Sequence, residues 1–442
     1  MSELTEWNWL PLAELIEDGR PICYGVLKPG DEDPEGVPLI RIVDIGDGRL
    51  YTQNLFRINR LLDQEFKRSR VAPGDLLLSI QGTIGRVAIV PSELQGANIS
   101  RTIARISFAD DLTPSFYKHW IKSNEGLKAT EDATVGSTRS SLNLSVLKKV
   151  PVPLPPRGEM SKVADVLDIV DTQIQKTKAL IAKLEKVKEA LLHDLLTRGI
   201  DESGRLRPSP EQAPELYKES PLGLIPREWS VSTLGERLSQ YGGFIQTGPF
   251  GSQLHAEEYV REGVPVVMPQ DMRDIEVSKE NIAQITEERA EDLARHRVGE
   301  GDLLFSRRGD LSRCSFMSSS NKGWLCGTGC LLLRPAEHID GFWLANIYKL
   351  SAIQSQVYGM AVGSTMVNLN STILKNIVIP FPAFQEQSKI AEAIKSSKNK
   401  IFEEINILSK LKLQKIGLID DLLTGRVRVT PLLDQAQATT PA

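Results

Sequence analysis

The chain has 442 residues, which is too long for one hydrophobic core and suggests about three units at ~150 residues each. Its hydrophobic content of 41% is ordinary for a soluble globular protein, and no apolar run is long enough to predict a membrane span. Residues 1–6 do not look like a secretory signal, and four cysteines are too few for a disulfide framework, so we expect a cytoplasmic protein. The net charge of −4 argues mildly against nucleic acid as a partner, although it says little about any one face.

The first 156 residues predict a globular α+β domain. Short β-rich runs at 76–80 and 87–90 are separated by Gly and Pro at hairpin-like intervals. A short helix is expected around 116–123. A proline-rich exit at 150–156 closes the domain, because proline has no backbone donor and restricts the residue before it.

A long helix is predicted over residues 157–200. Its seam residues recur at alternating steps of four and three, which is the heptad pattern of a coiled coil. These positions are Val163, Leu167, Val170, Ile174, Thr177, Ile181, Leu184, Lys188, Leu191 and Leu195. A stretch with five prolines, residues 201–226, then reads as an extended linker.

The second half repeats this order. We predict a globular domain at 227–383, a helix at 384–428 and a disordered tail at 429–442. The domain has β-rich runs at 264–267 and 331–333, a helical piece around 343–351 and a proline-containing exit at 378–382. The seam of the helix is Ile390, Ile394, Ser397, Ile401, Glu404, Leu408, Leu411, Lys415, Leu418 and Leu422.

One constant shift of 227 positions relates the two halves. It superposes residues 74–77 on 301–304, 135–138 on 362–365, and 194–197 on 421–424. The sequence therefore predicts a pseudo-two-fold internal repeat. Each helix is about 60 Å long at 1.5 Å per residue and cannot bury its apolar seam alone. We expect two similar globular domains separated by two long helices that form an antiparallel coiled coil.

Polar residues interrupt both seams at matching positions. Thr177 corresponds to Glu404, and Lys188 corresponds to Lys415. Such residues can fix the register of a coiled coil at a cost in stability, or the lysines can extend to solvent from the edge of the seam. The sequence leaves both interpretations open.

Catalytic and metal-binding motifs are not evident in the sequence. There is no phosphate-binding loop, no amino-methyltransferase motif and no dinucleotide fingerprint. The histidines are scattered, and Cys326 and Cys330 lack the further ligands that a zinc site needs. We therefore predict no active site, no metal and no cofactor in this chain.

Three motifs together with the repeated organisation point to a known family. They are Gln385-Glu386-Gln387 with the following 388–390 at the start of the second helix, residues 194–200 at the end of the first, and residues 301–309. Over nearly its whole length the chain resembles the specificity (S) subunit of a type I restriction–modification system. Residues 158–160 of the first helix depart from the Gln-Glu-Gln pattern.

The resemblance implies a role for each part. Each globular domain would be a target recognition domain that reads one half of a split double-stranded DNA site. The helices would set the spacer and dock two adenine methyltransferase (M) subunits, and motor-nuclease (R) subunits would complete the enzyme. The complex would use S-adenosylmethionine, and ATP and Mg²⁺ for restriction. The expected docking residues are Val163, Leu167, Ile174, Ile181, Gln385, Gln387, Ile390 and Ile401.

Candidate DNA-contacting residues follow from the side chains that suit base edges, because Arg pairs with guanine and Gln with adenine in the major groove. In the first domain they are Ser79, Gln81, Thr83, Arg86, Arg101 and Arg139. In the second they are Gln246, Ser252, Gln253, Arg273, Arg307, Arg308 and Arg313. The Ser-Thr pairs at 137–138 and 364–365 are common to both halves, so they predict a backbone or phosphate element, or a turn.

Two other functions remain compatible with the sequence. One is a structural adaptor whose coiled coil binds proteins, and the other is a nuclease or methyltransferase with unrecognised motifs. DNA pull-down would separate the DNA-reading subunit from the structural adaptor.

Overall fold

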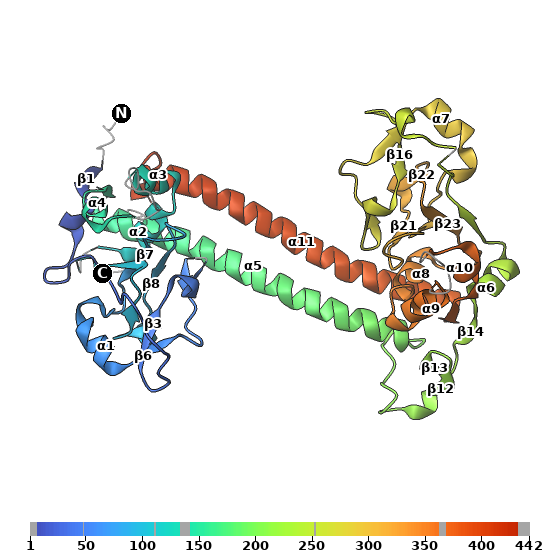
Figure 1. Cartoon of the computed structure of the whole chain (residues 1–442), viewed down its shortest axis with the longest axis horizontal. Helices are drawn as coiled ribbons and strands as arrows, with labels where there is room; N and C mark the ends of the chain where they lie inside the picture. The colour runs from blue at the N-terminus through green and yellow to red at the C-terminus, as the bar shows by residue number, and fades with distance from the viewer. Residues whose placement is uncertain are drawn as a thin grey trace. The chain divides into compact units, whose positions relative to one another are not determined.

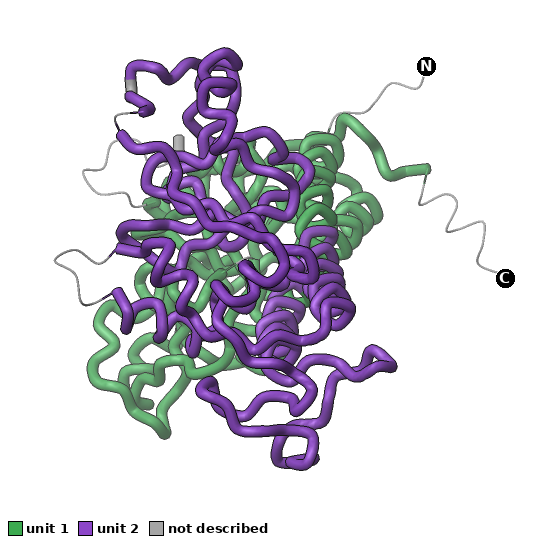
Figure 2. Tube along the Cα trace, turned by 90° about the vertical axis from the view of Figure 1, so that its right-hand side faces the viewer, with its two compact units in different colours: residues 1–180, 404–442 green, residues 181–403 purple. Residues whose placement is uncertain are grey.

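The computed structural model describes residues 7–46, 48–109, 112–132, 142–251, 253–361 and 368–431. The chain divides into two compact units, unit 1 with residues 1–180 and 404–442 and unit 2 with residues 181–403 (Figure 2). The two long helices, α5 (Arg157–Thr197) and α11 (Phe384–Leu423), each contribute residues to both units. Each unit therefore combines one globular domain with a part of each helix.

The globular domain of unit 1 is built on two small sheets (Figure 1). The four-stranded antiparallel sheet has the order β2 (Cys23–Tyr24), β10 (Ile103–Ile106), β7 (Leu76–Ser79) and β8 (Val87–Ile89). The mixed sheet has the order β6 (Arg57–Ile58), β3 (Val37–Ile40) and β9 (Asn98–Ile99). Two strand pairs complete it: β1 (Asn8–Pro11) with β11 (Pro151–Leu154), and β4 (Ile45–Gly46) with β5 (Arg49–Leu50). Its short helices are α1 (Arg60–Glu65), α2 (Pro114–Ile121), α3 (Asn124–Asp132) and α4 (Leu144–Leu147).

The domain of unit 2 repeats this plan. Its four-stranded sheet has the order β15 (Phe244–Thr247), β23 (Cys330–Arg334), β20 (Leu303–Ser306) and β21 (Cys314–Phe316). Its mixed sheet has the order β19 (Ala283–Ile285), β16 (Val264–Val267) and β22 (Leu325–Cys326). The strand pairs are β14 (Ser230–Thr233) with β24 (Val378–Phe381), and β17 (Met272–Arg273) with β18 (Glu276–Val277). Its helices are α6 (Leu234–Tyr241), α7 (Glu287–Asp292), α8 (Gly341–Ile347), α9 (Ser351–Ala361) and α10 (Ser371–Asn376).

The shift of 227 positions holds at the level of single strands. It relates β3 to β16, β7 to β20, β8 to β21 and β11 to β24, and it relates the first residue of α5 to that of α11. The predicted α+β repeat is thereby confirmed. The proline-rich exits form β11 and β24, each in a two-stranded pair, as expected for segments that cannot donate a full set of ladder hydrogen bonds.

The long helices run antiparallel within each unit. In unit 1, Lys415 of α11 donates to Asp171 of α5 at 2.5 Å, and Leu422, near the end of α11, shares a core with Val163, near the start of α5. In unit 2, Leu195 of α5 packs in one core with Ile390 of α11. Every predicted seam position is buried or half-buried, so the predicted heptad face is the packed face. Lys415 is engaged in this ion pair and has only 14% of its side chain exposed, so it does not extend to solvent.

Two segments outside the globular domains differ from the prediction. Residues 201–226 are not simply an extended linker, because they contain the hairpin of β12 (Tyr217–Ser220) and β13 (Gly223–Pro226) and the buried Arg207. The start of the predicted disordered tail is ordered, since Val429 is buried in the core of unit 1. Residues 432–442 lie outside the described residues. No described helix has the length and apolarity to cross a membrane.

Candidate nucleic-acid interface

Equivalent hairpins carry most of the residues that the sequence nominated. In unit 1 the hairpin joins β7 to β8, and in unit 2 it joins β20 to β21 (Figure 1). Ser79 is fully buried, and its hydroxyl donates to the Thr83 carbonyl at 2.6 Å and accepts from the Arg86 amide at 2.8 Å. Ser306 is also fully buried and donates to the Arg308 carbonyl at 2.8 Å. Ser79 was predicted to contact DNA, but its hydroxyl is buried and used inside the hairpin.

Arg86 and Arg313 are equivalent residues that tie each hairpin to the same neighbour. The Arg86 guanidinium donates to the carbonyl of Ile45 at 3.1 Å and, more weakly, to that of Ile42 at 3.3 Å. The Arg313 guanidinium donates to the carbonyl of Pro269 at 2.9 Å. Positions 42 and 269 are again separated by 227. A contact that both halves share cannot distinguish two different half-sites, so we assign these arginines to the scaffold of the hairpin rather than to base reading.

The hairpin tips differ between the units. Unit 1 presents Gln81, which is half-buried, and Thr83, which is exposed. Unit 2 presents the half-buried Arg307 and the exposed Arg308. Among the residues that the structure describes, no hydrogen bond or ion pair occupies the guanidinium of Arg307 or Arg308, and the Arg307 Nε is buried without a partner. Their charge is therefore available to a ligand.

Other loops meet the tips at the same end of each four-stranded sheet. In unit 2 the Arg307 amide donates to the Gly329 carbonyl at 2.9 Å, and β15 and β20 both end beside the start of β23. Phe250, in the loop after β15, is 56% exposed. In unit 1 the exposed Arg101 lies at the corresponding end, where its amide donates to the Val26 carbonyl at 2.9 Å. Each sheet therefore has one end that gathers several loops.

The remaining nominated residues separate into three groups. The Gln246 amide donates to the Arg295 carbonyl at 2.5 Å, and the Gln253 amide oxygen accepts from the Phe250 backbone at 3.0 Å, so both are engaged within the domain. Arg273 is exposed on β17. Arg139 and Ser252, and the repeated segments 135–138 and 362–365, lie outside the described residues.

Comparison with known proteins identifies the family. A family model described as "Type I restriction modification DNA specificity domain" matches residues 28–186 and 226–413, well over half of the chain. The chain belongs to this family.

Individual relatives agree with this assignment. The chain is 25% identical over 434 residues to a putative type I restriction enzyme MjaX specificity subunit of Methanocaldococcus jannaschii, covering 96% of this chain and 94% of that one. It is 32% identical over 192 residues to the EcoBI specificity subunit of Escherichia coli, a match that spans 42% of this chain and 40% of that relative. The crystal structure of the S subunit from M. genitalium superposes with a TM-score of 0.54 at 17% identity, over 95% of this chain and 96% of that one.

The docking residues predicted for this specificity subunit are mostly inaccessible. Val163, Leu167, Ile174, Gln387, Ile390 and Ile401 are buried within the chain, Ile181 is half-buried, and Gln385 is exposed. The prediction took the heptad seam for a partner surface, whereas each seam is packed against the other helix or the globular domain of its unit. Gln387, for example, bonds to the carbonyl of Pro382 at 3.0 Å and to the amide of Asp340 at 3.0 Å.

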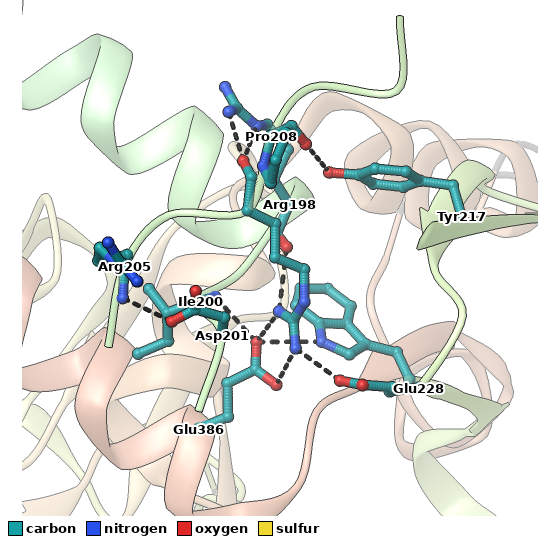
Figure 3. Close-up of polar contacts among 10 residues, drawn as sticks. Arg198, Ile200, Asp201, Arg205, Pro208, Tyr217, Glu228 and Glu386 are labelled. Atoms are coloured by element: carbon teal, nitrogen blue, oxygen red, sulfur yellow. Dashed lines mark hydrogen bonds and ion pairs between the residues drawn. The ribbon is translucent and has the colours of Figure 1, made fainter. Parts of the chain in front are cut away.

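A buried ion pair joins the start of α11 to the segment that follows α5 in unit 2 (Figure 3). Glu386 accepts from the Arg207 guanidinium at 2.5 Å, from the Trp229 indole at 3.2 Å and from the Ile200 amide at 3.0 Å. Gly199 has a φ of +64°, and a Cβ there would lie 2.2 Å from a Glu386 carboxylate oxygen. Only glycine fits at this helix end, since a side chain would displace the carboxylate.

Unit 1 contains the equivalent of this ion pair. Glu159, 227 positions before Glu386, accepts from the Arg428 guanidinium at 2.6 and 2.8 Å, from the Thr430 hydroxyl at 2.8 Å and from the Trp7 indole at 3.4 Å. Burial pushes the pKa of Glu159 up, but the hydrogen bonds from Arg428 and Thr430 outweigh it and hold the pKa below its usual range. Sequence reasoning missed both pairs. The usable evidence was the Glu-Trp dipeptide at 6–7 and 228–229, which precedes each domain.

A second polar cluster in unit 1 surrounds the buried His119. Its Nε2 lies 2.7 Å from Asp168 and its Nδ1 lies 3.9 Å from Asp171. Lys118 pairs with Asp168 at 2.5 Å, and Lys415 pairs with Asp171 at 2.5 Å. The imidazole and the two carboxylates could in principle hold a metal ion. Because both carboxylates are already paired with lysines, we interpret the cluster as a contact between domain and helix.

Lowering the pH from about 7 to 5 is expected to destabilise unit 1 through His119. Burial lowers the pKa of His119 in the folded chain, whereas the unfolded chain takes up this proton near pH 6.5. The unfolded state then binds more protons in this window, so stability falls as the pH drops through about 6.5. The charged groups that face the ring are Lys118, Asp168, Asp171 and Lys415.

The variant His119→Asn isolates this effect, because Asn346 occupies the equivalent position in unit 2 and is buried there. Urea denaturation at several pH values should give a shallower pH dependence for the variant than for the native chain. Equal slopes would show that another group controls the acid sensitivity.

Proposed function

We propose that this specificity subunit is the non-catalytic DNA reader of a type I restriction–modification complex, and that each of its domains reads one half of a gapped site in the major groove. The observation that carries the proposal is the pair of equivalent hairpins. Their buried anchors, Ser79 and Ser306, are the same, while their exposed tips differ in charge and hydrogen-bonding groups. Two readers on one scaffold suit a target with two unlike ends.

The helices would set the distance between the half-sites. Half-sites read from one face of DNA lie about 34 Å apart, one turn of the duplex, and helices of 41 and 40 residues are longer than this. The buried ion pairs of Glu159 and Glu386 hold the ends of the helices in place and would keep the length of the helical spacer fixed.

Methyltransferase subunits would dock on the apolar side chains that the helices leave exposed. Unit 1 exposes Ile169, Leu413 and Ile416, and unit 2 exposes Val187 and Phe402; Leu413 reaches 70% exposure. Apolar residues at this exposure on a long helix favour a protein partner. S-adenosylmethionine, ATP and Mg²⁺ would bind to the partner subunits, and the motor-nuclease subunits would join this assembly.

Mapping of methylated adenines tests the proposal. The chain is mixed with its methyltransferase subunit, supplied with S-adenosylmethionine and a DNA library, and the modified positions are sequenced. Two short half-sites separated by a constant unread spacer are expected. Modification within one continuous short site would contradict the two-reader arrangement.

Inserting one heptad into both helices should lengthen the recognised spacer. Seven residues placed after Leu180 in α5 and after Glu403 in α11 keep both seams in phase and add about 10 Å, or roughly three base pairs. The same methylation assay reads the new spacer, or shows loss of binding if the duplex cannot follow. Insertion into one helix only is the control and should abolish binding by putting the seams out of register. An unchanged spacer in the double insertion would rule out the helices as the ruler.

A further inference from the structure

The two long helices carry opposite charges at equivalent positions that face their own domains. Residues 168 and 171 of α5 are aspartates, whereas the residues 227 positions later on α11, 395 and 398, are lysines. Most of the chain follows the repeat in structure, so a charge reversal at the contact between domain and helix requires compensating changes on the domain.

In unit 1 the domain offers donors to Asp168. It accepts from the Ser115 hydroxyl, from the Lys118 ammonium at 2.5 Å and from the His119 ring at 2.7 Å, all on α2. His119 is fully buried, and Lys118 has only 12% of its side chain exposed. Asp168 therefore satisfies groups that would otherwise be buried without a partner.

In unit 2 the domain offers aromatic faces to Lys395. The Lys395 ammonium lies 4.7 Å from the Phe342 ring centroid and 5.7 Å from that of Phe316. A cation above an aromatic ring is attracted by the negative face of the ring, whereas a carboxylate there would be repelled. Phe342 occupies the position of Ser115, and Asn346 occupies that of His119, with its amide donating to the Phe342 carbonyl at 2.7 Å.

The second pair of equivalent positions, Asp171 and Lys398, is paired differently in the two units. Lys398 donates to Asp274 of its own domain at 3.0 Å, whereas Asp171 accepts from Lys415 of the other helix at 2.5 Å. The match between helix and domain is therefore tested at position 168 on α5 and position 395 on α11.

We propose that Asp168 and Lys395 are specificity-determining residues that match each recognition domain to its own helix. A first domain placed on α11 would bring Lys118 and His119 against Lys395 with no carboxylate to pair with them. A second domain placed on α5 would set Asp168 against the face of Phe342. Both mismatches disfavour the wrong arrangement, which the similarity of the two halves would otherwise permit. Exchange of a domain between the two positions then requires exchange of this helix residue.

The test reverses the helix charge and then restores the match. Asp168→Lys in the full chain should raise the unfolding equilibrium constant of unit 1 by about tenfold, since solvent screens part of the interaction at a side chain that is 40% exposed. Asp165→Lys is the matched control, since Asp165 is exposed one turn away on the same helix, and it should change this constant little. Hydrogen exchange of β7 and β10 measures the stability of unit 1.

The rescue uses residues copied from unit 2. Adding Ser115→Phe, Lys118→Ala and His119→Asn to Asp168→Lys rebuilds the second type of contact in unit 1 and should recover most of the lost stability. Unit 1 of a chain that carries the three domain substitutions but keeps Asp168 should remain destabilised. Failure of the rescue, or equal effects of the substitutions at 168 and 165, would overturn the proposal.

A domain transfer gives an independent measurement. Residues 8–156 replace 230–383, so that both positions carry the first domain, with Lys395 retained or changed to Asp. In the chain with Lys395→Asp, the transferred domain should be protected from hydrogen exchange at least about fivefold more strongly than in the chain with Lys395. Equal protection would contradict the matching role. Both experiments read folding without DNA, so they remain decisive for Asp168 and Lys395 even if methylation mapping refutes the gapped-site function.

Discussion

Replacing Arg307 with alanine is expected to weaken binding at one half-site by about 10- to 100-fold, and replacing Arg308 as well should extend the loss. Arg307 is fixed by its backbone, because its amide donates to Gly329 and its carbonyl accepts from Leu369, both at 2.9 Å. Its side chain is therefore held at the hairpin tip without an internal partner for its charge. A bidentate contact from such an arginine to guanine contributes about 1–3 kcal/mol to discrimination.

Binding should be measured on DNA with base changes in each half-site separately. The loss in Arg307→Ala should fall on the half-site of the second domain and leave discrimination at the first unchanged. Arg205→Ala is the control, because Arg205 is an exposed arginine outside both domains. An equal loss on all DNA sequences, with a reduced salt dependence, would show that Arg307 contacts phosphate and does not read a base.

Replacing Glu386 with alanine is expected to destabilise unit 2 by about 3 kcal/mol. The side chain of Arg207 is 8% exposed and that of Glu386 is 12% exposed, so removal of the carboxylate leaves a buried guanidinium without its buried counter-charge and the Trp229 indole without its acceptor. Glu228 also contacts Arg207, at 2.8 Å, but its side chain is 77% exposed and its contribution is screened by solvent.

Urea denaturation followed by hydrogen exchange in unit 2 measures this loss. Glu392→Ala provides the control, since Glu392 is exposed on the same helix and should change stability by less than about 0.5 kcal/mol. Glu159→Ala should destabilise unit 1 in the same way. If Glu386→Ala behaved like Glu392→Ala, the ion pair would contribute no net stability, as happens when desolvation cancels the attraction.

Several of the residues predicted to contact DNA are engaged within the domain, and the hairpins show why the sequence could not reveal this. The sequence placed Ser79 and Arg86 near one another because they are close along the chain, and it placed Arg307 in the equivalent hairpin of the second half. It could not show that Ser79 is buried, because burial depends on the packing of the whole domain. Nor could it show that Arg86 reaches the carbonyls of residues 42 and 45, because these contacts join segments over 30 residues apart. Equivalent residues in the two halves separate scaffold from base-reading residues, since contacts common to both halves belong to the scaffold.

The sequence by itself determined the repeat, the α+β domains and the two helices with their seams. These features depend on local periodicity, on proline and glycine, and on a constant shift between halves, all of which can be read along the chain. Only the tertiary structure decided which polar groups are used internally. Three residues acquire their roles from partners distant in sequence. They are Arg207 in the predicted linker, Glu159 where the Gln-Glu-Gln pattern is not kept, and Lys395 on a helix face. Burial and pairing depend on those distant partners, so no local pattern predicts them.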